Sequence, residues 1–215
     1  MLKNTTAQKI DELIERYPVL KECQAEITAA TDIICDGYRR GGKLIICGNG
    51  GSAADAEHIV GELMKGFLLP RPISEEMRER LREVCPKEAA YISDNLQGAL
   101  PALSLVNQVA LNTAFANDQA PDLAFAQQIL GMGRPEDVLL AISTSGNSTN
   151  VIYALQVARA KKMATVGLTG KKGGKLKELT DICLCVPEDA TYRIQELHLP
   201  VYHTLCIAVE NEFFG

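Results

Sequence analysis

One local pattern occurs twice along this chain: a short apolar run, then a turn rich in glycine or serine, then a helical period. Residues 44–47 (LIIC) lead into residues 48–52 (GNGGS), and residues 138–142 (VLLAI) lead into residues 143–148 (STSGNS). Runs that are apolar throughout are typical of strands buried on both faces, and strands that alternate with helices form parallel sheets. The repeated unit therefore predicts an α/β fold.

Two further apolar runs extend the predicted sheet. Residues 164–168 and 182–186 are predicted to be strands, while the helical periods at 52–67, 151–162 and 191–213 are predicted to cover them. Because the strands are apolar on both faces, we expect helices on both sides of the sheet, in a three-layer arrangement.

The N-terminal part predicts two successive helices within residues 6–38. Ile10, Leu13 and Ile14 form one apolar face, and Pro18 interrupts the pattern before it resumes. The whole chain has 215 residues, of which 47% are hydrophobic, so it is long enough to bury one sizeable core. We expect a single domain over residues 1–215.

The segment from about residue 68 to residue 96 differs from its surroundings. It contains Pro70, Pro72 and Pro86 and a charged run at residues 75–80. One interpretation is a solvated insertion with a short helix of its own, and the other is a lid over a binding site. It is too small to be a second domain.

Charge and cysteine content restrict the partners and the location. The chain has 22 Lys and Arg against 27 Asp and Glu, a net charge of −5, and no basic stripe, so we expect no nucleic acid partner. Its most apolar long stretch, residues 100–116, is too short and too polar to span a bilayer. The seven scattered cysteines and the polar start of the chain predict a cytoplasmic protein without a membrane partner.

The glycine-rich turn after the first strand predicts a ligand site. Asn49, Gly50, Gly51 and Ser52 stand between a strand and a helix, at the sheet edge where ligands bind in parallel sheets. Free N–H groups at the start of the helix favour an anion there. The turn matches neither the P-loop nor the dinucleotide pattern, so we expect no nucleotide cofactor. A tight strand-to-helix connection is the alternative interpretation.

The serine-rich turn after the second strand predicts a phosphate cradle. Ser143, Thr144, Ser145 and Ser148 stand with a glycine at a helix N-terminus, where their hydroxyl groups can donate to one phosphate without a cationic side chain. A simple N-cap role is the alternative for Ser148.

Imidazole and carboxylate groups are concentrated on two of the predicted helices. His58 and Glu62 are four residues apart and project from one helix face, where they can transfer protons or bind a metal. An ordinary helix-surface contact is the alternative. On the last helix Gln195, His198 and His203 fall within a limited sector of an otherwise apolar helix, and buried polar groups need partners.

Together these motifs resemble the sugar isomerase (SIS) domain family, in its phosphoheptose isomerase branch. The resemblance covers nearly the whole chain except the segment at about 68–96. It rests on residues 48–56 with His58 and Glu62, on residues 143–148, and on residues 193–196 (RIQE) with His198 and His203. It implies a single SIS domain with a five-stranded parallel sheet between helices, and a homotetramer with its sites at subunit boundaries.

The resemblance also implies an activity and a set of site residues. The reaction is the conversion of sedoheptulose 7-phosphate to D-glycero-D-manno-heptose 7-phosphate, with Glu62 and His203 as the acid/base pair. The implied substrate contacts are Asn49, Gly50, Gly51, Ser52, Asn117, Asp118, Ser143, Thr144, Ser145, Ser148 and Gln195. Some members bind zinc, which here implies one ion per subunit, held by His58, Glu62, Gln195 and His203.

The residue types suit that chemistry. Aldose–ketose isomerisation removes a proton from the carbon next to the carbonyl and moves another between the two oxygens of an enediol. A carboxylate and an imidazole are adequate for both steps. Burial of Glu62 is expected to raise its pKa toward the operating pH.

Some features depart from the family pattern. Gly66, next to Lys65, stands where an arginine is common, and Tyr192 stands where some members have an acidic residue. The spacing between Glu62 and Asp118 is also longer than usual. These positions concern recognition of the far end of the sugar. The alternative function is a non-catalytic SIS module that senses a phosphosugar, for which a phosphate cradle alone would be sufficient.

Overall fold

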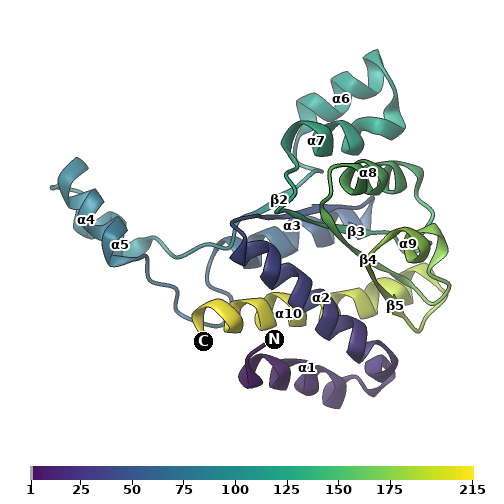
Figure 1. Ribbon diagram of the computed structural model, residues 1–215, viewed down its shortest axis with the longest axis horizontal. Coiled ribbons are helices and arrows are strands. Elements are labelled where there is room, and N and C mark those ends of the chain that lie inside the picture. Colours follow the sequence, from purple (N-terminus) through teal and green to yellow (C-terminus); the bar gives the residue numbers. More distant parts are fainter. Residues whose placement is uncertain (1) are drawn as a thin grey trace.

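A five-stranded parallel sheet forms the centre of the computed structural model, which describes residues 2–215 (Figure 1). Its strands are β1 (Leu44–Cys47), β2 (Ala102–Ser104), β3 (Val138–Ile142), β4 (Ala164–Gly170) and β5 (Ile182–Val186). They lie in the order β2-β1-β3-β4-β5, and every neighbouring pair is parallel. The order reverses between β1 and β3. In open α/β sheets such a switch point forms a crevice at the carboxyl ends of the strands.

Helices cover both faces of this sheet. On one face lie α1 (Asn4–Arg16), α2 (Gln24–Arg39), α3 (Gly51–Met64) and α10 (Thr191–Phe214). On the other lie α7 (Ala124–Met132), α8 (Thr149–Ala160) and α9 (Gly174–Leu179). The remaining helical segments are η1 (Pro18–Cys23), α4 (Glu75–Val84), α5 (Ala89–Asn95), α6 (Val109–Asp118) and η2 (Pro121–Leu123).

Side-chain alternation along the strands explains the two layers. Ile46 and Leu140 face the core under α2, α3 and α10, whereas Ile45 and Leu139 face the core under α7 and α8. Successive side chains of a strand point to opposite faces, so a strand that is apolar at every position supplies both cores at once. This confirms the α/β fold with a five-stranded parallel sheet between helices.

The elements differ from the sequence prediction at α6 and α7, which were not predicted, and where elements are short. The strand β2, at Ala102–Ser104, has three residues, and α9, at Gly174–Leu179, has six. Segments of this length contain too few positions to reveal a period. In the N-terminal part Pro18 begins the 3₁₀ segment η1 that separates α1 from α2.

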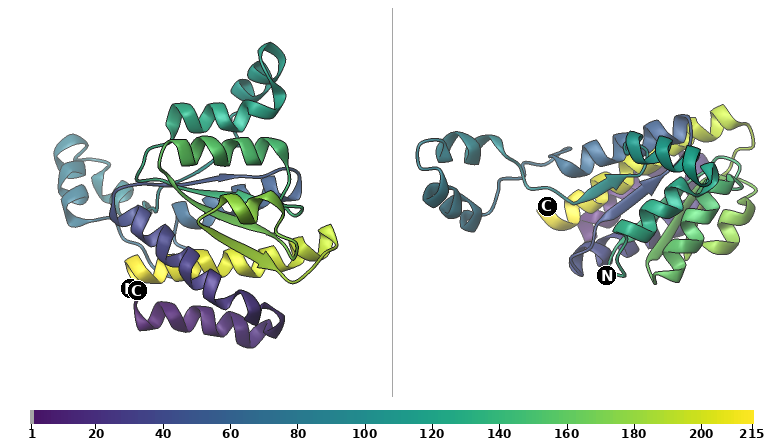
Figure 2. Two further views of the ribbon diagram at one scale, coloured as in Figure 1. Left: turned by 45° about the vertical axis from the view of Figure 1, so that its right-hand side comes forward. Right: turned by 90° about the horizontal axis from the view of Figure 1, so that it is seen from above.

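Residues 72–97 leave the body as an arm that stands apart from the layers in both views of Figure 2. An antiparallel bridge between Pro72 and Gln97 closes its base, and it contains the two helices α4 and α5, where one was expected. The arm ends just before β2 and therefore at the amino ends of the strands. It does not cover the turns that follow β1 and β3 in its own chain.

The longest helix, α10, extends along the body of the molecule to the C-terminus (Figure 1). It continues through Pro200 and carries Gln195 near its start and Glu210 near its end. Glu210 accepts a 2.8 Å hydrogen bond from Nε of the fully buried Arg71, which fixes the base of the arm. Within residues 2–215, no helix combines the length and the apolar character that a bilayer crossing requires.

Candidate active site

The two turns identified in the sequence meet at the carboxyl ends of the neighbouring strands β1 and β3. The side-chain amide of Asn49 donates to Oδ1 of Asn150 at 2.8 Å, and the amide of Asn150 donates to Oδ1 of Asn49 at 2.9 Å. This reciprocal pair connects the start of α8 to the glycine-rich turn. Asn150 was not among the predicted site residues, because a polar residue in the first turn of a helix carries no distinctive signal.

A cavity of about 300 Å³ lies between the two turns. It is lined by Asn49, Gly50, Gly51, Ser52, Ile142, Ser143, Thr144, Ser148, Thr191 and Gln195. None of these residues is cationic. Hydroxyl groups and the N-termini of α3 and α8 supply hydrogen-bond donors and partial positive charge, which suits an anion. We call this cavity the cradle.

The hydroxyl groups of the cradle lie close to one another. Oγ of Ser143 is 2.9 Å from Oγ of Ser148 and 3.5 Å from Oγ of Ser145. Ser148 occupies the N-cap position of α8, but its side chain makes no capping hydrogen bond. The N-cap interpretation of its hydroxyl is therefore wrong. Ser145 faces an adjoining cavity of about 270 Å³ that also includes Lys171 and Lys172.

Two glycines permit close approaches around the cradle. A Cβ on Gly51 would stand 2.3 Å from Nε2 of Gln195, so only glycine allows this side chain of α10 to lie against the start of α3. Gly146 has φ 66°, and a Cβ there would stand 2.0 Å from the carbonyl oxygen of Gly173. The turn of residues 143–148 therefore packs directly on the segment that precedes α9.

A second group of side chains lies where α3 packs against α10. Nε2 of His58 is 3.2 Å from Oε1 of Glu62, and the ring of His58 stands edge-on to the ring of His203, with centroids 5.0 Å apart. The helices thus bring both Glu62 and His203 to the imidazole of His58. We call these three residues the histidine–glutamate cluster.

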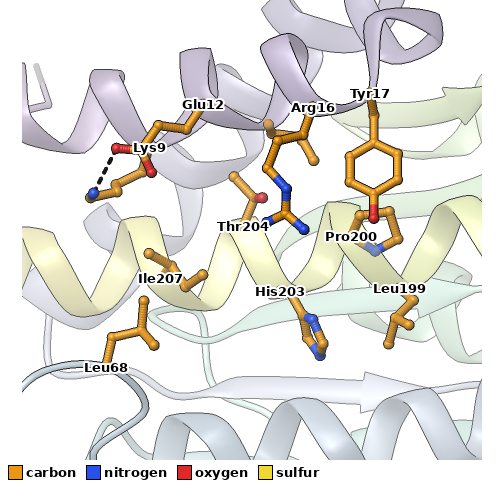
Figure 3. Close-up of a pocket in the computed structure, with 11 residues that line it drawn as sticks. Lys9, Glu12, Arg16, Tyr17, Leu68, Leu199, Pro200, His203, Thr204 and Ile207 are labelled. Atoms are coloured by element: carbon orange, nitrogen blue, oxygen red, sulfur yellow. Dashed lines mark hydrogen bonds and ion pairs between the residues drawn. The ribbon is translucent and has the colours of Figure 1, made fainter.

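His203 has the properties of a neutral imidazole with a free ring nitrogen. Its Nε2 is buried and has no hydrogen-bond partner within residues 2–215. Burial lowers the pKa of His203, the charge of His58 lowers it further, and Glu62 opposes both. His203 also borders a groove of about 240 Å³ between α1 and α10. In Figure 3, Arg16 extends from α1 toward α10, whereas His203 projects from α10 on the side away from α1.

The pKa of Glu62 differs from the expectation. Burial alone would raise this pKa, but the hydrogen bond from Lys65 at 2.8 Å, the charge of Lys65 and the contact with His58 together lower it below its ordinary value. The expectation of a raised pKa is therefore wrong for this chain. The side chain of Glu62 is 14% exposed, and the ammonium group of Lys65 reaches it from solvent.

Two further residues, Asp55 and Tyr202, interact with His58 of the cluster. The hydroxyl of Tyr202 is 3.0 Å from Nδ1 of His58, and its ring is buried in the core. Burial raises the pKa of Asp55, against the effect of a hydrogen bond with Tyr202. Through these contacts Asp55 and Tyr202 orient the ring of His58. Sequence reasoning missed Tyr202, because an aromatic residue in an apolar helix is normally part of the core.

The cradle and the cluster occupy different places in one chain. His203 does not line the cradle, and none of the cradle hydroxyls lines the groove beside His203. Gln195 and His203 are separated by eight residues of α10, or about 12 Å along its axis. A site that uses both regions at once therefore needs either a large substrate or a second subunit.

Three of the residues considered lie away from both regions. Asn117 donates a 2.8 Å hydrogen bond to Asp118 at the exposed end of α6, and neither residue lines the cradle. His198 is fully buried and faces Thr169 of β4, so it does not share the environment of His203. The limited sector predicted for α10 therefore divides into three separate environments.

The types of these side chains suit a metal ion, but their positions do not. Two imidazoles and a carboxylate are donors that zinc prefers, and the free Nε2 of His203 is available. Gln195, however, lies against Gly51 at the cradle. Within residues 2–215, no three His, Cys, Asp or Glu side chains converge closely enough to hold a metal. Zinc binding by His58, Glu62, Gln195 and His203 stays a prediction.

Comparisons with known proteins agree with this architecture. Two family models, both described as the SIS domain, match residues 7–98 and 101–208. The phosphoheptose isomerase of Roseiflexus sp. is 42% identical over 95% of this chain and 93% of its own. That of Akkermansia muciniphila is 36% identical over 94% of each chain.

Two solved structures share the fold over nearly their whole length. The phosphoheptose isomerase from Neisseria gonorrhoeae has a TM-score of 0.71 and 31% identity, and covers 95% of this chain and 93% of its own. The one from Francisella tularensis has a TM-score of 0.75 and 29% identity, with 94% of each chain covered.

Proposed function

This chain belongs to the SIS-domain family, in its phosphoheptose isomerase branch, and on that premise we propose that it is an isomerase that converts sedoheptulose 7-phosphate to D-glycero-D-manno-heptose 7-phosphate. The observation that carries the proposal is that one chain contains both a cation-free anion cradle and a carboxylate–imidazole cluster. A protein that only binds a phosphosugar needs the first but not the second.

The cradle suits the phosphate group of the substrate. Ser143 and Ser148 have their hydroxyls 2.9 Å apart, and the N–H groups at the start of α8 lie beside them. Hydrogen bonds to a charged phosphate are each worth about 1.5–3 kcal/mol. The phosphate group thereby anchors one end of an otherwise neutral and flexible sugar.

The cluster suits the proton transfers. Glu62, held ionised by Lys65 and His58, takes the proton from the carbon next to the carbonyl. His203, which is neutral and has a free Nε2, moves a proton between the two oxygens of the enediol. Tyr202 and Asp55 keep the ring of His58 in place between them.

We propose further that each site is completed across a subunit boundary of a homotetramer, in which one subunit supplies the cradle and its neighbour supplies the cluster. The support is the separation of the two regions within one chain, where they line different cavities. The proposal includes a cytoplasmic location, in keeping with seven cysteines that are all free.

The reaction is tested by incubating the protein in deuterated water with ketose phosphates of five to seven carbons. We expect deuterium at the carbon next to the carbonyl with sedoheptulose 7-phosphate, and none with the Glu62→Gln variant. Saturable binding without deuterium in any substrate would contradict the isomerase and favour a phosphosugar sensor.

The shared site is tested by subunit mixing. Glu62→Gln lacks the base, and a Ser143→Ala/Ser148→Ala double variant lacks the cradle hydroxyls. If the two regions come from different subunits, mixed oligomers contain some sites with both regions intact and regain activity. Each variant incubated with itself under the same conditions is the control. A mixture that stays as inactive as its components would place both regions in one subunit.

A further inference from the structure

Two thiol groups face each other on β5, the edge strand of the sheet beside β4. The Sγ atoms of Cys183 and Cys185 are 3.7 Å apart, and both residues are partly exposed. They are two positions apart on one strand, so they share the sheet face on which α9 lies, whereas Leu184 between them faces the opposite core. This pair takes no part in the proposed isomerase reaction.

We propose that Cys183 and Cys185 form a reversible thiol–disulfide site, which small-molecule disulfides oxidise and which, once oxidised, weakens phosphate binding in the cradle. The first half of this inference is independent of the proposed function. The second half rests on the proposed role of the cradle as a phosphate site.

The other cysteines lack this arrangement. Cys23, Cys35, Cys47 and Cys206 are buried, and burial raises the pKa of Cys23 to about 11 and that of Cys35 and Cys47 to about 12. Buried thiols with raised pKa values are inert, because the thiolate is the reactive form. Cys85 is partly exposed, but it lies on the arm at the end of α4, where its thiol contacts the carbonyl oxygen of Leu81.

The surroundings of the pair favour one thiolate. The hydrogen bond with Cys183 lowers the pKa of Cys185 below its ordinary value, burial opposes this shift, and Lys177 of α9 supports it. Glu26 of α2 is the acidic group that acts against it. The same hydrogen bond and burial raise the pKa of Cys183. An attacking thiol is most effective when its pKa lies near the ambient pH.

The exchange proceeds in two balanced steps. The thiolate of Cys185 attacks one sulfur of a small-molecule disulfide, so that the disulfide bond breaks, a mixed disulfide forms on Cys185 and one small thiolate leaves. Cys183 then loses its proton to solvent and attacks the sulfur of Cys185, which expels the second small thiolate. The protein dithiol is oxidised by two electrons, and the small disulfide is reduced to two thiols.

The geometry of a strand makes this disulfide strained and therefore reversible. Alternate Cα atoms of a strand are about 6.4–6.8 Å apart. This spacing is at the upper end of the range of about 4.4–6.8 Å that disulfides tolerate. Closing the sulfurs from 3.7 Å to bonding distance must shorten or bend β5. Strained disulfides are the more easily reduced ones.

Movement at the pair is transmitted to α9. Cys183 packs closely against β4, since a Cβ on Gly167 would stand 3.2 Å from the Sγ atom of Cys183. On the other side lie Thr180, whose hydroxyl donates to the carbonyl oxygen of Leu176 in α9, and Lys177, whose charge affects the pKa of both thiols. A bend of β5 is therefore expected to displace α9 rather than β4.

The start of α9 holds the turn of residues 143–148. The N–H of Leu176 donates to the carbonyl oxygen of Gly146 at 3.0 Å, and the N–H of Lys175 donates to Oδ1 of Asn147 at 3.1 Å. A displaced α9 pulls on this turn, which carries Ser143 and Ser148 of the cradle. The inferred sequence of contacts thus runs from the thiols through α9 to the phosphate site.

The thiol chemistry is tested on the reduced full-length protein with oxidised glutathione, followed by mass spectrometry of the peptide that contains both cysteines. We expect the wild type to lose two hydrogens as an internal disulfide that dithiothreitol reverses. Cys183→Ser is expected to stop at a glutathione adduct on Cys185, and Cys185→Ser is expected to form no internal disulfide. Cys85 serves as an internal control for the oxidant. Uptake of glutathione at Cys85 while Cys183 and Cys185 both stay free would overturn the inference.

The effect on the cradle is tested with inorganic phosphate as the probe, by calorimetry on the reduced and oxidised protein. Coupling between two sites typically changes an affinity by about 5-fold to 150-fold, so we expect phosphate affinity to fall by at least about fivefold on oxidation. Cys183→Ser/Cys185→Ser is expected to show no change. Equal affinities with the disulfide formed would overturn the coupling. Failure of the reduced protein to bind phosphate would contradict the proposed function and the coupling together, but not the disulfide.

Discussion

The cradle and the histidine–glutamate cluster are built in contrasting ways. The hydroxyls of Ser143 and Ser148 come from one turn, and their positions follow from the end of β3 and the start of α8. His58 and Tyr202, by contrast, are 144 residues apart and meet only because α3 packs against α10. The proposed anion binding therefore depends on one local turn, whereas the proposed proton transfer depends on tertiary packing. Four substitutions test this difference, and they are given in decreasing order of expected effect.

The largest effect is expected for Glu62→Gln, which removes the base but leaves the cradle unchanged. General acid–base catalysis contributes about 10²–10⁴-fold, so kcat should fall by about a thousandfold while phosphate affinity stays the same. Steady-state kinetics and phosphate calorimetry measure the two quantities. The control is Glu57→Gln, which changes an exposed carboxylate on the same helix. A kcat near the wild-type value would remove Glu62 from the reaction.

A second large effect concerns His198, which lies on α10 between the two regions and belongs to neither. Burial lowers its pKa to about 4. The unfolded chain binds the proton near pH 6.5 and the folded chain does not, so stability present above pH 6.5 is lost as the pH falls toward 4. The loss amounts to up to about 3 kcal/mol.

His198→Gln should remove this part of the pH dependence and leave kcat at pH 8 nearly unchanged. Urea unfolding at a series of pH values between 4 and 8 measures the difference between wild type and variant. Parallel stability curves for the two proteins would show that His198 titrates normally.

A smaller effect is expected for Ser148→Ala, which weakens the cradle but leaves the cluster intact. Loss of one hydrogen bond to a charged group costs about 1.5–3 kcal/mol, so phosphate affinity should fall by about tenfold to a hundredfold. Thr149→Ala, at the exposed neighbouring position, is the matched control. If kcat falls while phosphate affinity is unchanged, the hydroxyl of Ser148 does not bind phosphate.

The smallest effect is expected for Asn150→Ala, which breaks the reciprocal amide pair with Asn49. A neutral hydrogen bond contributes about 0.5–1.5 kcal/mol, so phosphate affinity should fall only by a factor of a few. Calorimetry on this variant and on Ser148→Ala ranks the two contributions. A loss as large as that of Ser148→Ala would mean that Asn150 contacts the anion itself.

The fold and the cradle were accessible to sequence reasoning because their signals are local. The runs at β1 and β3 are apolar at every position, and their glycine and serine turns follow directly. Helix positions such as His58 and Glu62 were found as well, because four residues return a helix to the same face. The short elements β2 and α9 were missed, since three and six residues give no period to detect.

The surroundings of those side chains were not accessible in the same way. Whether Glu62 has a raised or a lowered pKa depends on whether burial or the ammonium group of Lys65 dominates, and periodicity contains no information on that balance. The prediction placed His198 and His203 in one sector of α10. In the structure His198 faces the sheet, whereas His203 faces α3. Asn150 and Tyr202 have no distinctive pattern at all.

Hydrophobic periodicity and turn chemistry act over fewer than about twenty residues, so the parallel α/β architecture and the glycine- and serine-rich turns can be predicted from sequence alone. Only the tertiary structure decided which groups touch: Glu62 and His203 around His58, Asn49 against Asn150, and the thiols of Cys183 and Cys185 beneath α9. The physical reason is that pKa values and hydrogen bonds depend on distances between distant segments, and packing of the core sets those distances.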